Sequence, residues 1–419
     1  MPRISIRKPI SAISRRRCLA FAIGATASVA RNHPSLAAQP AAFARWGASF
    51  RNRALARGVS EATYDRVMGT VTPDNRVLAE YRAQPEFTEQ LWQYINRRCS
   101  EWRVITGKER IKDYADLLAR IEKDYGVDRY LMVGLWGMES SFGDVIVNRK
   151  YMRPVIPALA ALAWGEPRRR AYWDAELIHA LTIVDRGLAQ PPEMIGSWAG
   201  AMGHTQWMPE VWLHMGVDFD HDGRINPFGK PDDALAGTAR YLVARGRYRR
   251  GEAWGCEAAI PAGSHGLADN RTWRTYAQWH ERGIRRADGV AFARPEDRVR
   301  LWLPVPGGPA FLIGQNFYAV RSYNPSTCYT LALCHLGDLI RGNPPFRRQF
   351  PGGELVPTLA EIKEIQRRLN ERGFKTDGID GRTGSDTLRA VLGFQKKVGM
   401  EPADGYAGLK VLARLRQPG

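Results

Sequence analysis

The sequence predicts a mainly α-helical (α+β) protein with a small strand-containing subregion and a C-terminal three-helix domain. Apolar residues recur at three- and four-residue spacing from about residue 41 to residue 246, which is the period of an amphipathic helix. Between residues 251 and 320, glycine, proline and short β-prone runs replace that period. The chain has 419 residues, of which 44% are hydrophobic and 10% aromatic, so two or three domains with a sizeable core are expected.

The N-terminal segment, residues 1–38, is typical of an export signal. It holds seven Lys or Arg residues and no acid, and an apolar stretch from Cys18 to Ala30 follows the arginines, with small-residue cleavage sites. Residues 14–19, Ser-Arg-Arg-Arg-Cys-Leu, resemble a twin-arginine signal in which Cys18 replaces the usual Phe, and the Sec route stays open. No later apolar run approaches the length of a membrane span. A soluble periplasmic protein is therefore expected.

Residues 39–342 are predicted to form the main domain. Its helical spacing is clearest at residues 114–126 and 171–187, and a helix is expected again from about Ser326. Three β-prone runs predict the strands of the subregion, at residues 299–305, 310–314 and 317–320.

Residues 343–357 are rich in proline and glycine and are predicted to be a linker. The unit that follows, residues 358–417, contains two amphipathic helices, 361–374 and 385–399, separated by a glycine-containing loop. A short helix is expected at its end. This unit is predicted to be a separate three-helix domain.

The charge of the chain points to an acidic partner. Removing the seven cations of residues 1–38 lowers the formal charge from +18 to +11, which is still strongly basic. Nucleic acid is not expected, because the basic residues are scattered, no nucleic-acid module is apparent and an export signal is predicted. A cell-wall polymer that carries peptide carboxylates fits better, although a generally solvated basic surface is the alternative.

The mature chain keeps four cysteines, Cys99, Cys256, Cys328 and Cys334, which allow three disulfide pairings in an oxidising compartment. Cys328 and Cys334 lie six residues apart in an expected helix, where their side chains do not meet. No Cys or His metal spacing occurs. Free thiols and a monomer are expected.

One carboxylate, Glu139, lies in the otherwise apolar stretch Leu131–Gly143. Burial disfavours the charged form of a carboxyl group, so an unpaired Glu there has a raised pKa and holds its proton near neutrality. Such a group is a candidate general acid. The alternative is a salt bridge to an arginine.

A second stretch, residues 196–209, packs small residues between aromatic ones. Glycine and alanine at this density let a ligand or another backbone segment approach closely. Ser197 and Gln206 are the polar groups able to bind a sugar hydroxyl, an N-acetyl group or Glu139. The alternative is a tight packing turn in which Met202, Trp207 and Met208 belong to the core.

Residues 218–226 have the alternating acids and the glycine of the first half of an EF-hand loop. Position twelve is Gly229 instead of Glu, so a different residue would have to close the site. An Asx-turn loop held by its own hydrogen bonds is the alternative. The candidate calcium ligands within this stretch are Asp218, Asp220, Asp222 and Arg224.

Five motifs in order, WGMESSFG, GSWAGAMGHTQWMP, VDFDHDG, DALAGTARYL and RSYNPSTCYTLAL, resemble the lytic murein transglycosylases of the soluble lytic transglycosylase B type. The resemblance covers about residues 41–342 and implies a lysozyme-like helical fold with Glu139 as its single catalytic acid. It places Ser197, Gln206, Tyr241 and Tyr323 along the sugar cleft. Tyr94 is one candidate for a further cleft aromatic residue, and both Tyr241 and Tyr323 could instead be ordinary half-buried tyrosines.

The same resemblance implies two further features. Some family members have an EF-hand-like calcium site closed by a later Asp, for which Asp233 or its neighbour Asp232 is placed, with a structural role for the ion and no cofactor in catalysis. Residues 358–415, with IQRRLNERGF, DGIDGRTGSDTLRAVLGFQ and DGYAGLKVLARL, resemble the three-helix peptidoglycan-binding module of wall hydrolases. Peptidoglycan glycan strands are the implied partner.

A single acid suits the implied reaction. Most glycosidases use two carboxylates, and no second carboxylate lies in a comparable motif here. Glu139 would protonate the oxygen between N-acetylmuramic acid and N-acetylglucosamine and then accept the proton of the muramoyl 6-hydroxyl, which closes a 1,6-anhydro ring. A hydrolytic muramidase on the same fold and a noncatalytic peptidoglycan-binding protein remain the alternatives.

Overall fold

The computed structural model describes residues 38–82, 89–148 and 152–418. Met1–Ala42 and Phe43–Gly419 are separate units, and the fold below is that of the second unit. The predicted export signal lies outside the described residues, apart from Ala38 at the start of helix α1. Within the described part of the chain, no helix is both long enough and apolar enough to cross a membrane.

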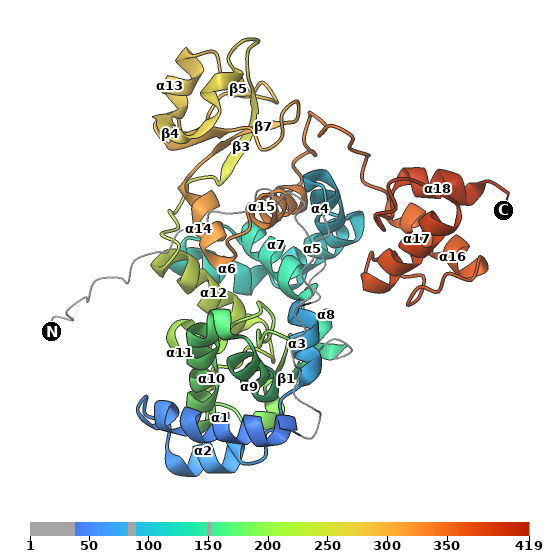
Figure 1. The fold of residues 1–419 in the computed structure, drawn as a ribbon. Coiled ribbons are helices and arrows are strands. Elements are labelled where there is room, and N and C mark those ends of the chain that lie inside the picture. The colour runs from blue at the N-terminus through green and yellow to red at the C-terminus, as the bar shows by residue number, and fades with distance from the viewer. Residues whose placement is uncertain (1–37, 83–88, 149–151, 419) are drawn as a thin grey trace, which may run out of the picture. The chain divides into compact units, whose positions relative to one another are not determined.

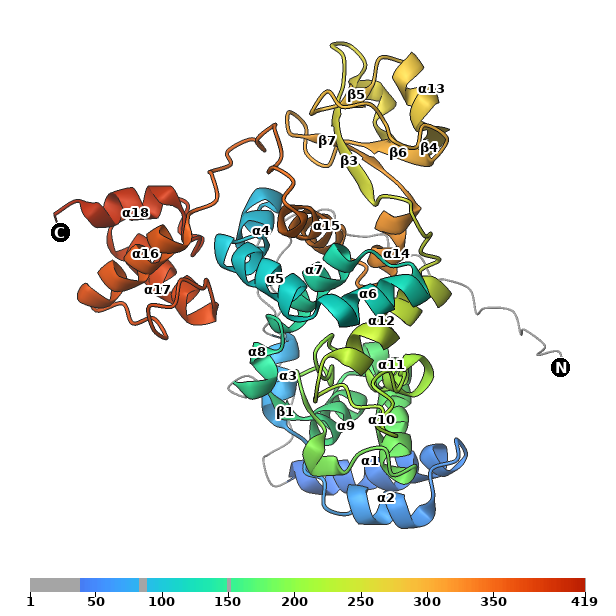
Figure 2. The same cartoon turned by 180° about the vertical axis from the view of Figure 1, so that it is seen from behind.

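One group of helices surrounds α9, which is apolar on all sides and therefore buried. Leu159 and Leu162 of α9 have no exposed surface, and α10 lies beside α9 in both views (Figures 1 and 2). A two-stranded antiparallel sheet, β1 with β2, leads into and out of this group. Its elements are α1 (Ala38–Leu55), α2 (Glu61–Met68), α3 (Asn75–Arg82), β1 (Arg153–Pro154), α9 (Val155–Gly165), α10 (Arg170–Asp185), β2 (Ile195–Gly196) and α11 (Pro209–Met215).

A second group of helices has its own core, built around α7 and α15. Leu135, Leu333 and Leu336 of these two helices are fully buried. The group contains α4 (Leu91–Arg98), α5 (Glu101–Asp113), α6 (Ala115–Tyr125), α7 (Arg129–Ser140), α12 (Asp232–Ala244), α14 (Gln315–Tyr323) and α15 (Thr327–Arg341), and the short α8 (Asp144–Val147) follows α7.

The strand-containing subregion is a five-stranded antiparallel sheet in the order β4-β6-β7-β3-β5. Trp279 of α13 packs beneath it without exposed surface and donates its indole N–H to the carbonyl oxygen of Val299 at 3.1 Å. The elements, drawn yellow to orange in Figure 1, are β3 (Gly255–Ala259), β4 (Asp269–Thr275), α13 (Tyr276–Glu281), β5 (Arg285–Arg286), β6 (Arg298–Trp302) and β7 (Ala310–Ile313).

The strand predicted at residues 317–320 is wrong, because these residues lie in helix α14. Phe317 and Val320 are both buried, at the three-residue spacing of one helix face. β-Branched and aromatic residues favour strands only weakly, and burial against neighbouring helices outweighs that preference here. The runs 299–305 and 310–314 do contain strands, β6 and β7.

The C-terminal unit consists of α16 (Leu359–Glu371), α17 (Ser385–Lys397) and α18 (Leu409–Arg416) around its own apolar core. Two buried glutamines hold its two loops in the same way. The Gln366 side-chain oxygen accepts the N–H of Gly381 at 2.8 Å, and the Gln395 side-chain oxygen accepts the N–H of Gly405 at 2.7 Å. Both glutamines therefore have a structural role, because they satisfy the polar groups of the turns.

The predicted linker, residues 343–357, contains neither helix nor strand, but part of it is fixed to the main domain. Phe346 stacks on the His335 ring with centroids 3.7 Å apart, and Phe350 is buried in the core of the second helical group. The four cysteines of the described residues are free thiols, as expected.

Candidate active site

Glu139 lies in the last turn of α7, where the chain reverses sharply. The helix begins at Asp128, whose carboxylate accepts the backbone N–H groups of Tyr130 and Leu131. It ends where Ser141, Phe142 and Gly143 adopt positive φ angles of 51°, 61° and 91°. Three consecutive left-handed residues, two of them not glycine, are uncommon and are typical of a functional site.

Two glycines allow α15 to approach α7 closely. A Cβ atom on Gly134 would lie 3.2 Å from the carbonyl oxygen of Leu333, and one on Gly337 would lie 3.2 Å from the carbonyl oxygen of Tyr130. Larger side chains at these positions would force the helices apart. This packing brings Tyr329, in the first turn of α15, to Glu139 in the last turn of α7.

The Tyr329 hydroxyl donates a hydrogen bond to Oε1 of Glu139. The Glu139 side chain is partly buried, and its removal from water raises the pKa to about 7. The Tyr329 hydrogen bond and the positive charge of Arg98 act in the opposite direction and lower the pKa. The expected rise in the pKa of Glu139 is thus present, and a large fraction of the groups is protonated at neutral pH.

Tyr329 was not among the candidates from the sequence. Burial and the neighbouring Glu139 carboxylate raise its pKa far above the usual value, so the hydroxyl keeps its proton and remains a donor. Tyr329 lies in the motif RSYNPSTCYTLAL, six residues after Tyr323. At this position on an apolar helix face, the sequence predicts an ordinary core tyrosine. Only the packing of α15 against α7 reveals its partner.

The segment 196–209 is a tight turn with polar groups fixed by its own backbone. The Ser197 hydroxyl accepts the N–H of Ala201 at 3.2 Å, and the Gln206 side-chain amide donates to the carbonyl oxygen of Gly203 at 3.0 Å. Gln206 has a positive φ of 55°, which is uncommon for a residue other than glycine. Met202 and Trp207 are fully buried, so the packing alternative holds for these two residues.

Tyr323 connects this segment to the neighbourhood of Glu139. Its hydroxyl donates to the carbonyl oxygen of Thr205, the residue before Gln206. Burial and, to a smaller extent, the Glu139 carboxylate raise the pKa of the Tyr323 hydroxyl. The Tyr241 ring meets the Tyr323 ring edge-on with centroids 5.2 Å apart. Three of the candidate residues, Gln206, Tyr241 and Tyr323, are therefore linked by direct or adjacent contacts, and the charge of Glu139 acts on the pKa of Tyr323. The Ser197 side chain bonds within its own turn.

His204 joins α7 to residues 218–233, which we call the aspartate loop. The indole N–H of Trp136 lies 3.1 Å from Nδ1 of His204, and Nε2 lies 2.8 Å from the carbonyl oxygen of Gly229. Because an indole N–H can only donate, Nδ1 accepts and Nε2 carries the proton. Burial lowers the pKa of His204, which keeps the imidazole neutral and preserves both bonds.

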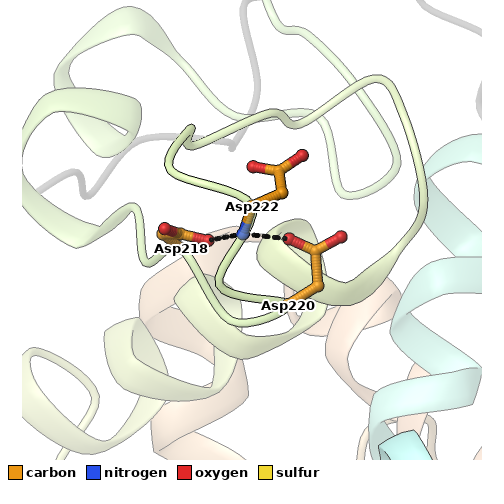
Figure 3. Close-up of side chains that lie close together, drawn as sticks. All are labelled: Asp218, Asp220 and Asp222. Atoms are coloured by element: carbon orange, nitrogen blue, oxygen red, sulfur yellow. Dashed lines mark hydrogen bonds between the residues drawn. The ribbon is translucent and has the colours of Figure 1, made fainter.

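The aspartate loop brings three carboxylates together. Oxygen atoms of Asp218, Asp220 and Asp222 lie within 4.8 Å of one another (Figure 3). The N–H of Asp222 also donates to the side chains of Asp218 at 3.1 Å and Asp220 at 3.4 Å, as the dashed lines in Figure 3 mark. Carboxylate oxygens are the ligands that calcium prefers, and a bound cation would offset the mutual repulsion of three carboxylates at this spacing.

Asp233 closes the loop through the backbone. Its two carboxylate oxygens accept the N–H groups of Phe219 at 2.7 Å and Asn226 at 2.8 Å, and the side chain is buried. Burial and the charges of Asp220 and Asp218 raise the pKa of Asp233. Asp232, the alternative closing residue, lies instead 3.8 Å from Arg120 in an ion pair.

The fifth metal candidate, Arg224, follows the three aspartates in the loop. Its backbone N–H donates to Asp222 at 2.9 Å, and its guanidinium lies 3.9 Å from Glu193. Its backbone carbonyl is the group that an EF-hand loop would use at this position.

Two acids of α10, Asp174 and Glu176, have structural partners. Asp174 pairs with Arg53 at 3.0 Å, and the Glu176 carboxylate accepts the N–H of Glu210 at 3.1 Å. The groups that act on the pKa of Glu139 are Tyr329 and Arg98, and neither is a carboxylate. Among the described residues, no carboxylate thus acts on the pKa of Glu139.

The lysozyme-like helical fold described above is that of the transglycosylase SLT domain family. The family's model matches residues 42–338, and the chain belongs to this family. Residues 358–415 match the peptidoglycan binding domain family.

Individual relatives agree with this assignment. The chain is 32% identical over 231 residues to membrane-bound lytic murein transglycosylase B of Escherichia coli strain K12, over 54% of this chain and 61% of that protein. The chain thus matches about three fifths of the length of that relative.

Solved structures cover more of the chain. SltB3 of Pseudomonas aeruginosa in complex with NAG-anhNAM-pentapeptide has a TM-score of 0.69 at 37% identity, over 90% of this chain and 99% of that one. Lytic transglycosylase Slt35 of Escherichia coli in complex with calcium has a TM-score of 0.59 at 26% identity, over 70% of this chain and 92% of that one.

Proposed function

We propose that the protein is a peptidoglycan lytic transglycosylase that cleaves the β-1,4 bond between N-acetylmuramic acid and N-acetylglucosamine and leaves a 1,6-anhydromuramoyl end. The observation that carries the proposal is the environment of Glu139, a lone carboxyl group whose pKa is about 7 and whose Oε1 accepts the Tyr329 hydroxyl. The family match and the ligand named for the SltB3 structure support the same substrate class.

Glu139 acts first as an acid and then as a base. Because the Tyr329 hydroxyl donates to Oε1, the proton of the carboxylic acid resides on Oε2, which transfers it to the glycosidic oxygen as the bond to the anomeric carbon breaks. The resulting carboxylate is stabilised by the Tyr329 hydrogen bond and by the charge of Arg98. It then takes the proton of the muramoyl 6-hydroxyl while that oxygen bonds to the anomeric carbon, which restores the acid.

The internal hydroxyl replaces water because it is held beside the anomeric carbon at high effective concentration. A muramidase would need a second group to activate water, and two acids of α10, Asp174 and Glu176, are engaged in structural contacts. This favours the transglycosylase over the hydrolytic alternative. The sugar-binding residues in this proposal are Ser197, Gln206, Tyr241 and Tyr323, with Tyr94 and Tyr329 added to the aromatic set.

Mass spectrometry of the fragments released from purified sacculi tests the reaction. The wild-type protein should release muropeptides that end in 1,6-anhydromuramic acid, and Glu139→Gln, which keeps the shape of the side chain, should release none. Asp144→Asn is the matched control, because it removes a nearby carboxylate outside the proposed chemistry. Reducing ends would identify a hydrolase, and sacculus binding without release would identify a noncatalytic protein.

We infer that the aspartate loop binds a structural calcium ion. Asp218, Asp220 and Asp222 would supply side-chain oxygens, Arg224 would supply its carbonyl, and Asp233 would close the site. The calcium complex named for the Slt35 structure supports this. The expected role is structural, because the neutralised loop is tied to α7 through His204.

Calorimetric titration with Ca²⁺ and the thermal midpoint with and without a chelator test this inference. Calcium should raise the midpoint of the wild type but not of Asp220→Asn, by an amount that follows the ratio of free calcium to the dissociation constant. An equal midpoint with and without calcium in the wild type would contradict the calcium site.

We also propose that the protein acts in the periplasm as a monomer and binds wall glycan through residues 358–417. The export signal is the support for the location, and the peptidoglycan binding domain match is the support for the wall contact. Fusion of residues 1–38 to a reporter, with Arg15 and Arg16 replaced by Lys, distinguishes twin-arginine export from Sec export.

A further inference from the structure

Arg98, the last residue of α4, is a partly buried arginine that lies against an aromatic ring. Its guanidinium lies over the Tyr94 ring, 5.2 Å from the centroid, one helical turn away on the same face of α4. The positive charge of the arginine lowers the pKa of Glu139. Arg98 therefore belongs to the surroundings of the proposed catalytic acid.

Arg98 has no anionic partner among the described residues. Its Nε–H is buried without a hydrogen-bond acceptor, and no described carboxylate lies within ion-pair distance of its guanidinium. Proteins rarely bury a charged donor without an acceptor, because the desolvation is then uncompensated. Such an orphaned donor near an active site indicates a group that meets its acceptor on a ligand.

The two neighbouring arginines show the contrast. Arg97 pairs with Glu89 at 2.5 Å. Arg103 donates to the carbonyl oxygens of Gly137 at 3.3 Å and Arg97 at 3.0 Å, which fixes α5 to the last turns of α7 and α4. Both therefore have structural acceptors. The Nε–H of Arg97 is also buried without an acceptor, and Arg103 also lies over an aromatic ring, that of Trp102 at 5.9 Å. Among the described residues, Arg98 differs from both in having neither an ion pair nor a hydrogen-bonded carbonyl acceptor.

Tyr94 contacts the guanidinium through its ring and a side-chain hydrogen bond, but it does not neutralise the positive charge. A planar cation that stacks on a tyrosine leaves its N–H groups free at the edge, where they can bind both oxygens of a carboxylate. Helix α15 contacts both α4 and α7, and Tyr94 of α4 is one of the groups that raise the pKa of Tyr329 in α15. The three helices therefore meet around Glu139 and Tyr329. A carboxylate on the substrate could reach Arg98 while the glycosidic bond lies at Glu139.

We propose that Arg98 is a specificity-determining residue that binds a carboxylate carried by the muramoyl unit of the substrate. The inference rests on the proposed function and adds to it the reason why the enzyme would prefer peptidoglycan to an uncharged glycan. The muramoyl unit can present this carboxylate from two sources. One is the lactyl group of a peptide-free strand, and the other is the stem peptide of an intact strand, in which the lactyl carboxyl is an uncharged amide.

Binding in the Glu139→Gln background tests the proposal apart from catalysis. Soluble glycan strands are prepared with stem peptides, without peptides so that the lactyl carboxylate is free, and without peptides but with that carboxylate converted to a methyl amide. Dissociation constants are measured with Arg98 intact, with Arg98→Gln and with Arg98→Lys. Arg97→Gln is the matched control, because it removes a neighbouring charge that already has a protein partner. Circular dichroism confirms that each variant folds.

With Arg98 intact, at least one anionic strand should bind about 10-fold to 100-fold more tightly than the neutral strand, as expected for a charge-assisted pair. Arg98→Gln should abolish this preference and change neutral binding less than twofold, while Arg98→Lys should keep part of it. A preference for the peptide-free strand identifies the lactyl carboxylate, and a preference for the peptide-bearing strand identifies the stem peptide.

Equal weakening on all three strands by Arg98→Gln would overturn the proposal and leave Arg98 as a structural residue or a modulator of Glu139 alone. No preference with Arg98 intact would overturn it as well. A failure of the proposed function is a separate result. The wild type would then cleave none of the three strands, whatever the binding preference of the Glu139→Gln protein.

Discussion

Replacing Tyr329 by Phe removes the hydrogen bond to Glu139 and keeps the ring in the core. The carboxylate form of Glu139 then loses a donor that stabilises it, so the pKa of Glu139 rises above its wild-type value of about 7. Because the protonated form acts as the acid, kcat/KM falls as the pH rises through this pKa. The alkaline limb of the pH profile should therefore move to higher pH in the variant.

The size of the shift follows from the strength of the bond. A hydrogen bond to a charged group contributes about 1.5 to 3 kcal/mol, and one pKa unit corresponds to about 1.4 kcal/mol. The limb should therefore move upward by about one to two pH units. The same loss raises the energy of the carboxylate formed after proton donation, so kcat at pH 6 should fall by about 10-fold to 100-fold.

The assay is the initial rate of anhydromuropeptide release from soluble glycan strands between pH 5 and pH 10. Tyr248→Phe is the matched control, because Tyr248 is a buried tyrosine whose hydroxyl accepts the N–H of Asp128, at the opposite end of α7 from Glu139. Its profile should match that of the wild type. An alkaline limb that stays in place or moves to lower pH in Tyr329→Phe would refute the assigned role of Tyr329.

Three further predictions concern stability. The wild type should lose up to about 3 kcal/mol of unfolding free energy between pH 4.5 and pH 7, because the folded pKa of Glu139, about 7, lies above the unfolded value. Glu139→Gln should not show this loss, so its stability relative to the wild type should be greater at pH 8 than at pH 4. Identical pH dependence of the two proteins in urea denaturation would contradict this. Gly134→Val should cost about 1 to 3 kcal/mol through its contact with α15, whereas Gly47→Ala, with open space around it in α1, should be neutral or stabilising. His204→Leu leaves the indole N–H of Trp136 and the carbonyl oxygen of Gly229 without partners, and should lower the free energy of unfolding by about 2 to 4 kcal/mol in denaturant titration. His335→Phe keeps the stacked ring and should lower it less. A smaller loss in His204→Leu than in His335→Phe would contradict the bridging role.

Much of the fold could be predicted because its signals are local. The periodic spacing of apolar residues indicated the helices, and the glycine and proline content separated the strand region and the linker. The strand prediction for residues 317–320 was wrong for the same reason, since a four-residue apolar run carries no period that distinguishes a strand from one buried face of α14.

The candidate site divides in a similar way. The rise in the pKa of Glu139 could be predicted from the sequence, because the apolar residues around it in α7 indicate burial. The aspartate cluster could be predicted because its three members are spaced two residues apart. The role of Asp233, whose carboxylate accepts two backbone N–H groups of the loop, could not be predicted from its spacing alone.

By itself, the sequence determined the helical architecture, the single acid in an apolar helix, and the family resemblance that motif order carries. Only the tertiary structure decided which groups surround that acid. Tyr329 and Arg98 lie 190 and 41 residues from Glu139 along the chain, and they reach it because glycines let α15 approach α7 while α4 packs on α15. Helical period is a property of neighbouring residues, whereas this meeting of three helices depends on close packing between distant ones.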